Sequence, residues 1–96
     1  MRKQNTRTGA CKVTFELPPD VQARSAYVCG DFNGWSSTAN RLTRRKDGHL
    51  RVVVPLEPGR AYRFRYLLDD GRWENDWQAD AYAPNIFGTD DSVVAV

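Results

Sequence analysis

The strongest constraint on the fold is a period-two alternation of apolar and polar residues that recurs in separate short segments of the chain. In the clearest segment, the residues that share one apolar face are Tyr62, Phe64, Tyr66 and Leu68. Residues 11–17 and 50–56 repeat the same alternation. This periodicity is typical of β-strands with one buried face, whereas a helix would repeat every three to four residues.

Turn-forming residues separate the alternating segments. They include Pro18-Pro19-Asp20, Lys46-Asp47-Gly48 and Asp69-Asp70-Gly71. Proline cannot donate to a strand ladder, and Asp-Gly pairs favour tight hairpins. Short strands about ten residues apart, with turns between them and no helical period, predict an all-β fold. We expect an immunoglobulin-like antiparallel β-sandwich of about seven to eight short strands.

The size of the chain indicates one domain. A chain of 96 residues has room for a single hydrophobic core, and we expect one β-sandwich over residues 11–96. Residues 2–9 contain no apolar side chain and several basic ones, so we expect a disordered basic arm over residues 1–10.

Neither a membrane nor a nucleic acid is indicated as a partner. No apolar run is long enough for a secretory signal or a membrane span, so we expect a cytoplasmic protein. The formal net charge of +2 is too small to define a partner. The basic cluster over residues 41–46 is interpreted as a solvated hairpin tip, not as a phosphate-binding patch.

The two cysteines are expected to be free thiols. Strand parity directs Cys11 into the core and Cys29 outward, which places the two sulfurs on opposite faces of the sheet. We therefore expect Cys29 to react with thiol reagents and Cys11 to be protected. No Cys/His spacing suggests a metal site, His49 has no ligand partner in sequence, and no cofactor is predicted.

Two tryptophans follow tight turns. A short apolar strand runs into Gly30, the chain turns through Asn33-Gly34, and Trp35 comes directly after the turn. Trp73 likewise follows the turn at Asp70-Gly71. Such positions hold an indole at a defined angle beside a sheet, which suits either ligand binding or packing at the end of the sandwich.

Six motifs in order resemble one known family. They are Gly30-Asp31-Phe32-Asn33-Gly34-Trp35, Leu56-Glu57-Pro58-Gly59, Phe64-Arg65-Tyr66, Asp70-Gly71-Arg72-Trp73, Asn75-Asp76 and Phe87-Gly88-Thr89. This series resembles carbohydrate-binding module family 48, which includes the glycogen-binding module of the AMP-activated protein kinase β subunit and the early-set domains of branching and debranching enzymes. The resemblance covers about residues 12–96 and implies an early-set β-sandwich.

The resemblance also implies a ligand, an α-1,4-linked glucan such as glycogen, starch or maltooligosaccharide. It implies that Trp35 and Trp73 stack on glucose rings and that Arg65, where the family has lysine, bonds to hydroxyls. Phe87 stands where the family inserts a hydrophobic side chain beneath the curved glucan. Ser92 stands where the family uses an asparagine for hydrogen bonding, and Asn33 completes the set of candidate ligand-binding residues.

The same resemblance implies that the chain is not an enzyme, because the catalytic residues of branching and debranching enzymes belong to a separate barrel domain. The carboxylates over residues 69–80 could form a glycosidase pair only across a substrate cleft. The alternative to glucan binding is a structural or regulatory protein-interaction domain that has lost sugar binding. A glycogen-metabolising enzyme or a kinase-type assembly is the candidate protein partner. We expect Trp77 to pack in the core or at a sheet edge, and Asn75, Asn85 and Thr89 to form turns.

Overall fold

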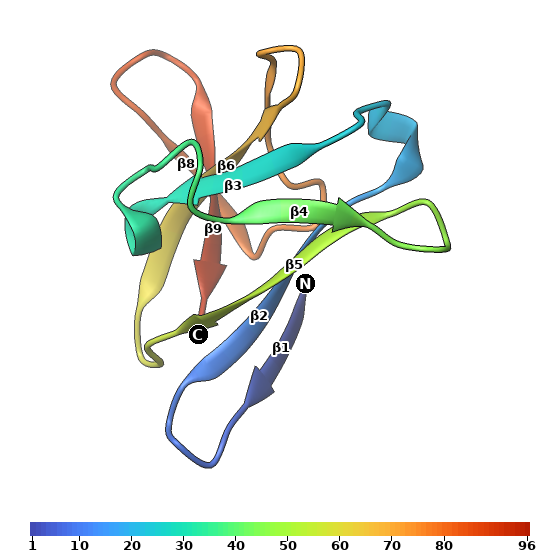
Figure 1. The fold of residues 1–96 in the computed structure, drawn as a ribbon. Helices are drawn as coiled ribbons and strands as arrows, with labels where there is room; N and C mark the ends of the chain where they lie inside the picture. The colour runs from blue at the N-terminus through green and yellow to red at the C-terminus, as the bar shows by residue number, and fades with distance from the viewer.

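The fold is built almost entirely from short β-strands, as Figure 1 shows. The structure is a computed structural model that describes all residues from Met1 to Val96. Its nine strands are β1 (Arg2–Asn5), β2 (Cys11–Leu17), β3 (Ala26–Gly30), β4 (Arg41–Arg44), β5 (Leu50–Leu56), β6 (Ala61–Leu68), β7 (Trp73–Glu74), β8 (Ala81–Pro84) and β9 (Asp90–Ala95). Two short 3-10 helices, η1 (Pro19–Val21) and η2 (Asp31–Asn33), lie in the connections. None of the helices has the length and apolar content needed to cross a membrane.

All strand pairs are antiparallel, in the order β1-β2-β5-β4-β3-β6-β9-β8, and β7 pairs with β6. β4 pairs with β3 through Arg41 and Leu42, and with β5 through Thr43 and Arg44. The sheet therefore curls into two facing layers, with β2 and β5 in one and β3, β6 and β9 in the other (Figure 1). This confirms the predicted all-β, immunoglobulin-like class, with nine strands in place of seven to eight.

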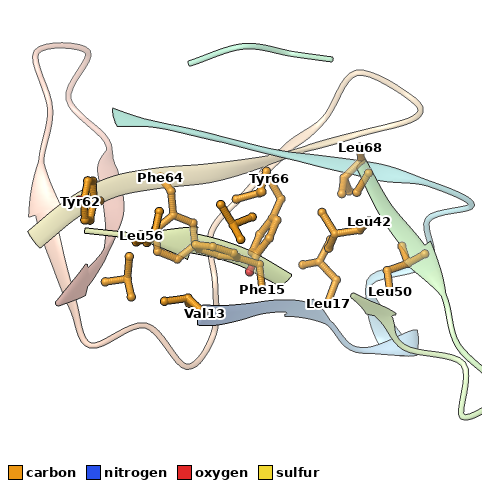
Figure 2. Packing of buried hydrophobic residues seen from close by; sticks show 14 of the residues in the cluster. Val13, Phe15, Leu17, Leu42, Leu50, Leu56, Tyr62, Phe64, Tyr66 and Leu68 are labelled. Carbon is orange, nitrogen blue, oxygen red and sulfur yellow. The ribbon is translucent and has the colours of Figure 1, made fainter. Parts of the chain in front are cut away.

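The core lies between β6 and β2, as Figure 2 shows. Most of the alternating residues that were expected to point inward are buried in a cluster of 16 side chains that includes Val13, Phe15, Leu17, Phe64, Tyr66 and Leu68, and Val52 is partly buried against this cluster. Phe15 and Phe64 meet edge to face, with ring centroids 5.0 Å apart. Because alternate side chains of a strand point to opposite faces of the sheet, the apolar residues at every second position form one apolar face on each layer.

The N-terminal residues are ordered as β1, which corrects the expectation of a disordered arm over residues 1–10. Arg2 pairs with Thr14 and Asn5 with Cys11 along β2. All four residues of β1 are exposed, so the strand carries no alternation for sequence reasoning to detect. An edge strand of charged and polar residues is a common protection against unwanted strand pairing. Lys3 also contacts the carboxylate of Asp80 at 2.6 Å.

The cysteines are free, as expected, but the expected exposure of Cys29 is wrong. Cys11 belongs to the core, whereas Cys29 lies outside that cluster and is nevertheless 0% exposed. Its cross-strand partner is Arg65, so both side chains occupy the outer face of the layer. Burial raises the pKa of the Cys29 thiol above its usual range, which lowers its reactivity.

Both thiols should therefore be protected in the folded protein. Because the thiolate is the reactive form and neither sulfur is exposed, a thiol reagent is expected to label Cys11 and Cys29 only after denaturation. Mass spectrometry of labelled peptides measures the two sites separately. Rapid native labelling of Cys29 alone would contradict the burial of this side chain on the outer face.

Candidate functional site

The turn after β3 fixes Trp35 at the edge of the outer layer. A Cβ at Gly30 would lie 2.5 Å from the carbonyl oxygen of Arg63, so only glycine permits this approach between β3 and β6. Gly34 and Trp35 then adopt left-handed backbone conformations, with φ of 64° and 60°. Such a φ is unfavourable for a bulky residue and persists only where surrounding contacts hold it. The backbone N–H of Trp35 donates to the carbonyl of Gly30 at 2.8 Å.

Asn33 is a turn residue and does not line the site, which corrects its assignment as a ligand contact. Its side-chain oxygen accepts from the backbone N–H groups of Gly30 and Ser36, at 3.1 and 3.2 Å. Its side-chain nitrogen donates to the carbonyl of Val28 and to Asn40, at 2.9 and 2.8 Å. Two donated and two accepted bonds use the whole capacity of an amide, so no group remains for a sugar.

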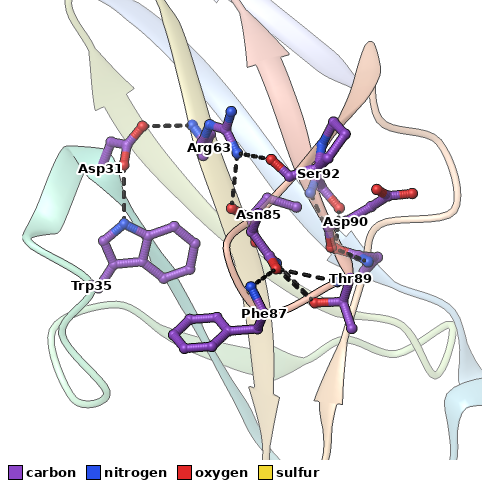
Figure 3. A network of polar contacts seen from close by, with 11 residues as sticks. Asp31, Trp35, Arg63, Asn85, Phe87, Thr89, Asp90 and Ser92 are labelled. Atoms are coloured by element: carbon purple, nitrogen blue, oxygen red, sulfur yellow. Dashed lines mark hydrogen bonds and ion pairs between the residues drawn. The ribbon is translucent and has the colours of Figure 1, made fainter.

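Asp31 positions the Trp35 ring, a role that the sequence did not indicate. One carboxylate oxygen accepts from the indole Nε1–H at 3.0 Å, and the other accepts from the backbone N–H of Arg63 at 2.9 Å (Figure 3). The carboxylate thus links the turn to β6. A ring held in this way keeps its angle before any ligand arrives, which reduces the entropy lost on binding.

Asp31→Ala should release the Trp35 ring. The loss of two hydrogen bonds is expected to lower the free energy of unfolding by about 1–3 kcal/mol and to increase motion of the indole. Nitrogen relaxation of the Trp35 Nε1 resonance measures this motion directly. Asp90→Ala removes an exposed carboxylate from β9 and is the matched control. Unchanged relaxation at Trp35 would contradict the positioning role.

Arg65 and Trp73 meet on the outer face of β6. The guanidinium carbon of Arg65 lies 5.8 Å from the centre of the Trp73 ring, a cation–π contact. The Nε of Arg65 is buried without a hydrogen-bond partner. In the turn before Trp73, the backbone N–H of Arg72 donates to Asp70 and lowers the pKa of that carboxyl. The indole itself is 46% exposed.

The loop between β8 and β9 presents Phe87, which is 82% exposed. Asn85 closes this loop, because its side-chain oxygen accepts from the backbone N–H groups of Phe87 and Thr89 at 2.9 and 3.2 Å. This confirms the expected turn roles of Asn85 and Thr89. The neighbouring Ile86 is 93% exposed, and sequence reasoning did not single it out. Two apolar side chains at the tip of a stabilised loop favour contact with a ligand or partner.

These elements surround a groove of about 950 Å³. Its lining residues are Asp31, Trp35, Arg63, Arg65, Trp73, Pro84, Asn85, Ile86, Phe87 and Asp91. The structure thus brings together four of the six predicted site residues, Trp35, Arg65, Trp73 and Phe87, from four separate parts of the chain. Trp35 is 37% exposed, so neither groove tryptophan belongs to the buried core.

Ser92 lies outside the groove and is fully buried, which corrects its assignment as a ligand contact. Its hydroxyl donates to the side-chain oxygen of Asn75 at 2.9 Å and accepts from the backbone N–H of Asp76 at 2.8 Å. Asn75 also donates to the carbonyl of Asp90 at 2.9 Å. Ser92 and Asn75 therefore fasten the loop after β7 onto β9.

Trp77 is 57% exposed, so the expected core or edge packing of this residue is wrong. Its indole Nε1–H donates to the Glu74 carboxylate at 3.3 Å. The ring lines a second, smaller cavity that shares no residue with the groove. The neighbouring Asp76 is the buried residue of this loop and is 5% exposed.

The groove combines flat apolar rings with balanced charge. Arg63 donates to the carbonyl of Pro84 at 3.0 Å and pairs with Asp91 at 3.4 Å. Two arginines and two aspartates line the same surface, so no strong field of one sign selects an ion. An open surface with aromatic faces and fixed polar groups can bind an uncharged, flat, hydrogen-bonding ligand.

Known proteins share the segment that builds most of this groove. The sequence profile of carbohydrate-binding module 48 (isoamylase N-terminal domain) matches residues 20–83, which include Trp35, Arg65 and Trp73 but not Phe87. The chain is also 36% identical, over 63 residues, to the 1,4-alpha-glucan branching enzyme GlgB of Butyrivibrio fibrisolvens. That match covers 64% of this chain and 10% of the enzyme. Because the profile matches more than half of the chain, the protein belongs to the carbohydrate-binding module 48 (isoamylase N-terminal domain) family.

Proposed function

We propose that the chain is a non-catalytic module that binds α-1,4-linked glucan in the groove of Trp35, Arg65, Trp73 and Phe87. The observation that carries this proposal is the placement of two partly exposed indoles and an exposed phenylalanine around one groove. Membership of a carbohydrate-binding family makes a sugar the natural ligand of such a surface. The similarity to a glucan branching enzyme favours an α-glucan.

Each groove residue has a physical role in this proposal. The indoles of Trp35 and Trp73 offer flat apolar area to the C–H face of glucose rings. Arg65 has further N–H donors beyond its contact with Trp73, and these suit hydroxyl groups. Phe87 lines the same groove, and Figure 3 shows its ring near that of Trp35. In this proposal Phe87 supports the inner side of a curved glucan.

The expected affinity is low. Two stacked rings bury about 200 Å² of apolar surface, which contributes about 5 kcal/mol at about 25 cal/mol per Å². Hydroxyl contacts add about 1 kcal/mol each, and association costs several kcal/mol. The balance corresponds to a Kd between millimolar and tens of micromolar. This range is adequate for a module that acts beside a polymer with many repeated units.

A titration followed by NMR tests the proposal. The chain has three tryptophans, and their indole N–H resonances report each ring separately. Maltohexaose or β-cyclodextrin should shift the Trp35 and Trp73 resonances with saturation in the millimolar range or below. Cellohexaose has the same sugar units with β-1,4 links and serves as the control. If neither resonance moves with any α-glucan at millimolar concentration, the glucan function is wrong, and the interaction-domain alternative takes its place.

The branching enzyme that resembles this chain is about ten times longer than the matched segment, since the match covers 10% of it. We therefore assign no chemistry to the groove. Its carboxylates, Asp31 and Asp91, accept hydrogen bonds from Trp35 and Arg63 and act as supports of the binding surface. A glycogen-metabolising enzyme is the proposed partner, delivered to its polymer by this module.

A further inference from the structure

A second cavity, of about 350 Å³, lies apart from the groove and shares no lining residue with it. It is bounded by β1, β2, the residue before β5 and the loop after β7. Its wall includes Arg2, Glu16, His49, Asp76, Trp77 and Gln78. We propose that this cavity is a second saccharide site, which holds a short segment of the same α-glucan against Trp77.

Trp77 is exposed, and the residue directly before it is firmly held. Asp76 is fixed on both sides, because its side chain accepts from the Tyr66 hydroxyl at 2.6 Å and its backbone N–H donates to Ser92 at 2.8 Å. The Asp76 carbonyl also accepts from the Tyr82 hydroxyl at 2.5 Å. A large apolar ring presented to solvent on an anchored loop is preorganised for contact with a ligand.

The wall of the cavity carries charges of both signs, which disfavours an ionic ligand. Glu16 and Asp76 would repel an anionic ligand, whereas Arg2 would repel a cationic one. Glu16 is further engaged with Arg51 and faces His49 at 3.7 Å. No group of three or more His, Cys, Asp or Glu residues is arranged to hold a metal ion. A neutral ligand suits this balance.

The cavity combines one aromatic side chain with several polar groups. Only two of the nine lining residues are hydrophobic, Met1 and Trp77. Thr14 and Gln78 supply a hydroxyl and an amide, which can both donate and accept. The volume lies at the lower end of the range of about 300–1,000 Å³ for ligand pockets. One aromatic face beside polar donors and acceptors fits a hexose better than an apolar molecule.

Two sites on one module would increase binding to a branched polymer. The choice of α-glucan as the second ligand rests on the proposed function of the groove. Once one chain of the polymer occupies the groove, a neighbouring chain meets the Trp77 cavity at high effective concentration. Affinity for glycogen should therefore exceed affinity for a single maltooligosaccharide by about tenfold or more, without additional contacts in the groove.

NMR of the whole chain with defined variants tests this site. In the double variant Trp35→Ala/Trp73→Ala, the remaining Trp77 indole resonance should still shift with millimolar maltohexaose and not with cellohexaose. Trp77→Ala should leave maltohexaose binding in the groove unchanged and lower affinity for glycogen by about tenfold or more. Trp77→Phe, which retains an aromatic face, should recover part of that loss.

The outcomes separate the two proposals. If maltohexaose moves the Trp35 and Trp73 resonances but not that of Trp77, the second site is wrong and the groove function stands. If it moves Trp77 alone, the groove function is wrong and the cavity is the glucan site. If it moves none of the three, both are wrong. Glycogen binding by Trp77→Ala equal to that of the unmodified chain also overturns the second site.

Discussion

Trp73→Ala should remove measurable binding of maltohexaose to the groove while the domain stays folded. The indole is 46% exposed and contributes one of the two stacking faces. Loss of an aromatic anchor costs about 2 kcal/mol or more, roughly a 30-fold loss of affinity, which takes an already weak interaction beyond detection. The shift of the Trp35 indole N–H resonance with maltohexaose measures binding in the groove, and chemical denaturation measures the stability.

The free energy of unfolding of the variants distinguishes a ligand-binding role of the groove tryptophans from a role in core packing. The contact of Trp73 with Arg65 is an exposed cation–π pair worth about 0.5–1 kcal/mol, so Trp73→Ala should lower the free energy of unfolding by about 1 kcal/mol. A loss of about 3–5 kcal/mol would instead show an indole that fills the core. Trp35→Gly is a useful companion, because glycine removes the ring and also relieves the φ of 60° at that position.

Asp76→Ala should destabilise the domain more than any substitution in the groove. The buried carboxylate accepts from the Tyr66 hydroxyl at 2.6 Å and from the backbone N–H of Gln78 at 2.8 Å. A hydrogen bond to a charged group contributes about 1.5–3 kcal/mol, and alanine leaves both donors without a partner. The expected loss is about 3–5 kcal/mol of a total of about 5–15 kcal/mol, measured by urea denaturation.

Tyr66→Phe is the control for this network, because it removes one hydroxyl and retains the ring. Burial, followed by the nearby charge of Asp76, raises the pKa of Tyr66 well above its ordinary value. A raised pKa means that the folded state retains this proton, so the stabilisation is fully present below about pH 10 and is lost as the pH rises above it. The unmodified protein should therefore lose stability in alkali more steeply than Tyr66→Phe. Equal slopes for the two proteins would contradict the network.

Much of the fold could be predicted because the burial of strands follows their own sequence. The faces of β2 and β6 were identified from alternation alone, since each strand has one side in the core. β1 was missed because both of its faces are exposed and no pattern results. The burial of Cys29 was missed because alternation within β3 does not show which neighbours, such as Arg65 on β6, lie beside this side chain on the outer face.

The candidate site could be predicted only in part. Trp35 and Trp73 follow turn-forming residues, and Arg65 alternates with the buried residues of β6. Their positions outside the core could therefore be inferred from the sequence. Asn33 and Ser92 were assigned to the ligand, although the side chains of both form hydrogen bonds with groups of the protein itself. A polar side chain in a sequence gives no indication of whether its partners are backbone groups or a ligand.

The sequence by itself determined the two-layered architecture, because alternation, turn residues and chain length leave few ways to bury one core. Only the tertiary structure decided which side chains share a surface. Trp35, Arg65, Trp73 and Phe87 come from the turn after η2, from β6, from β7 and from the β8–β9 loop, and strand order brings them around one groove. The same packing turned Asp76 inward and Trp77 outward, since a buried carboxylate requires a hydrogen-bond donor, and the donor here is the Tyr66 hydroxyl, ten residues earlier on β6.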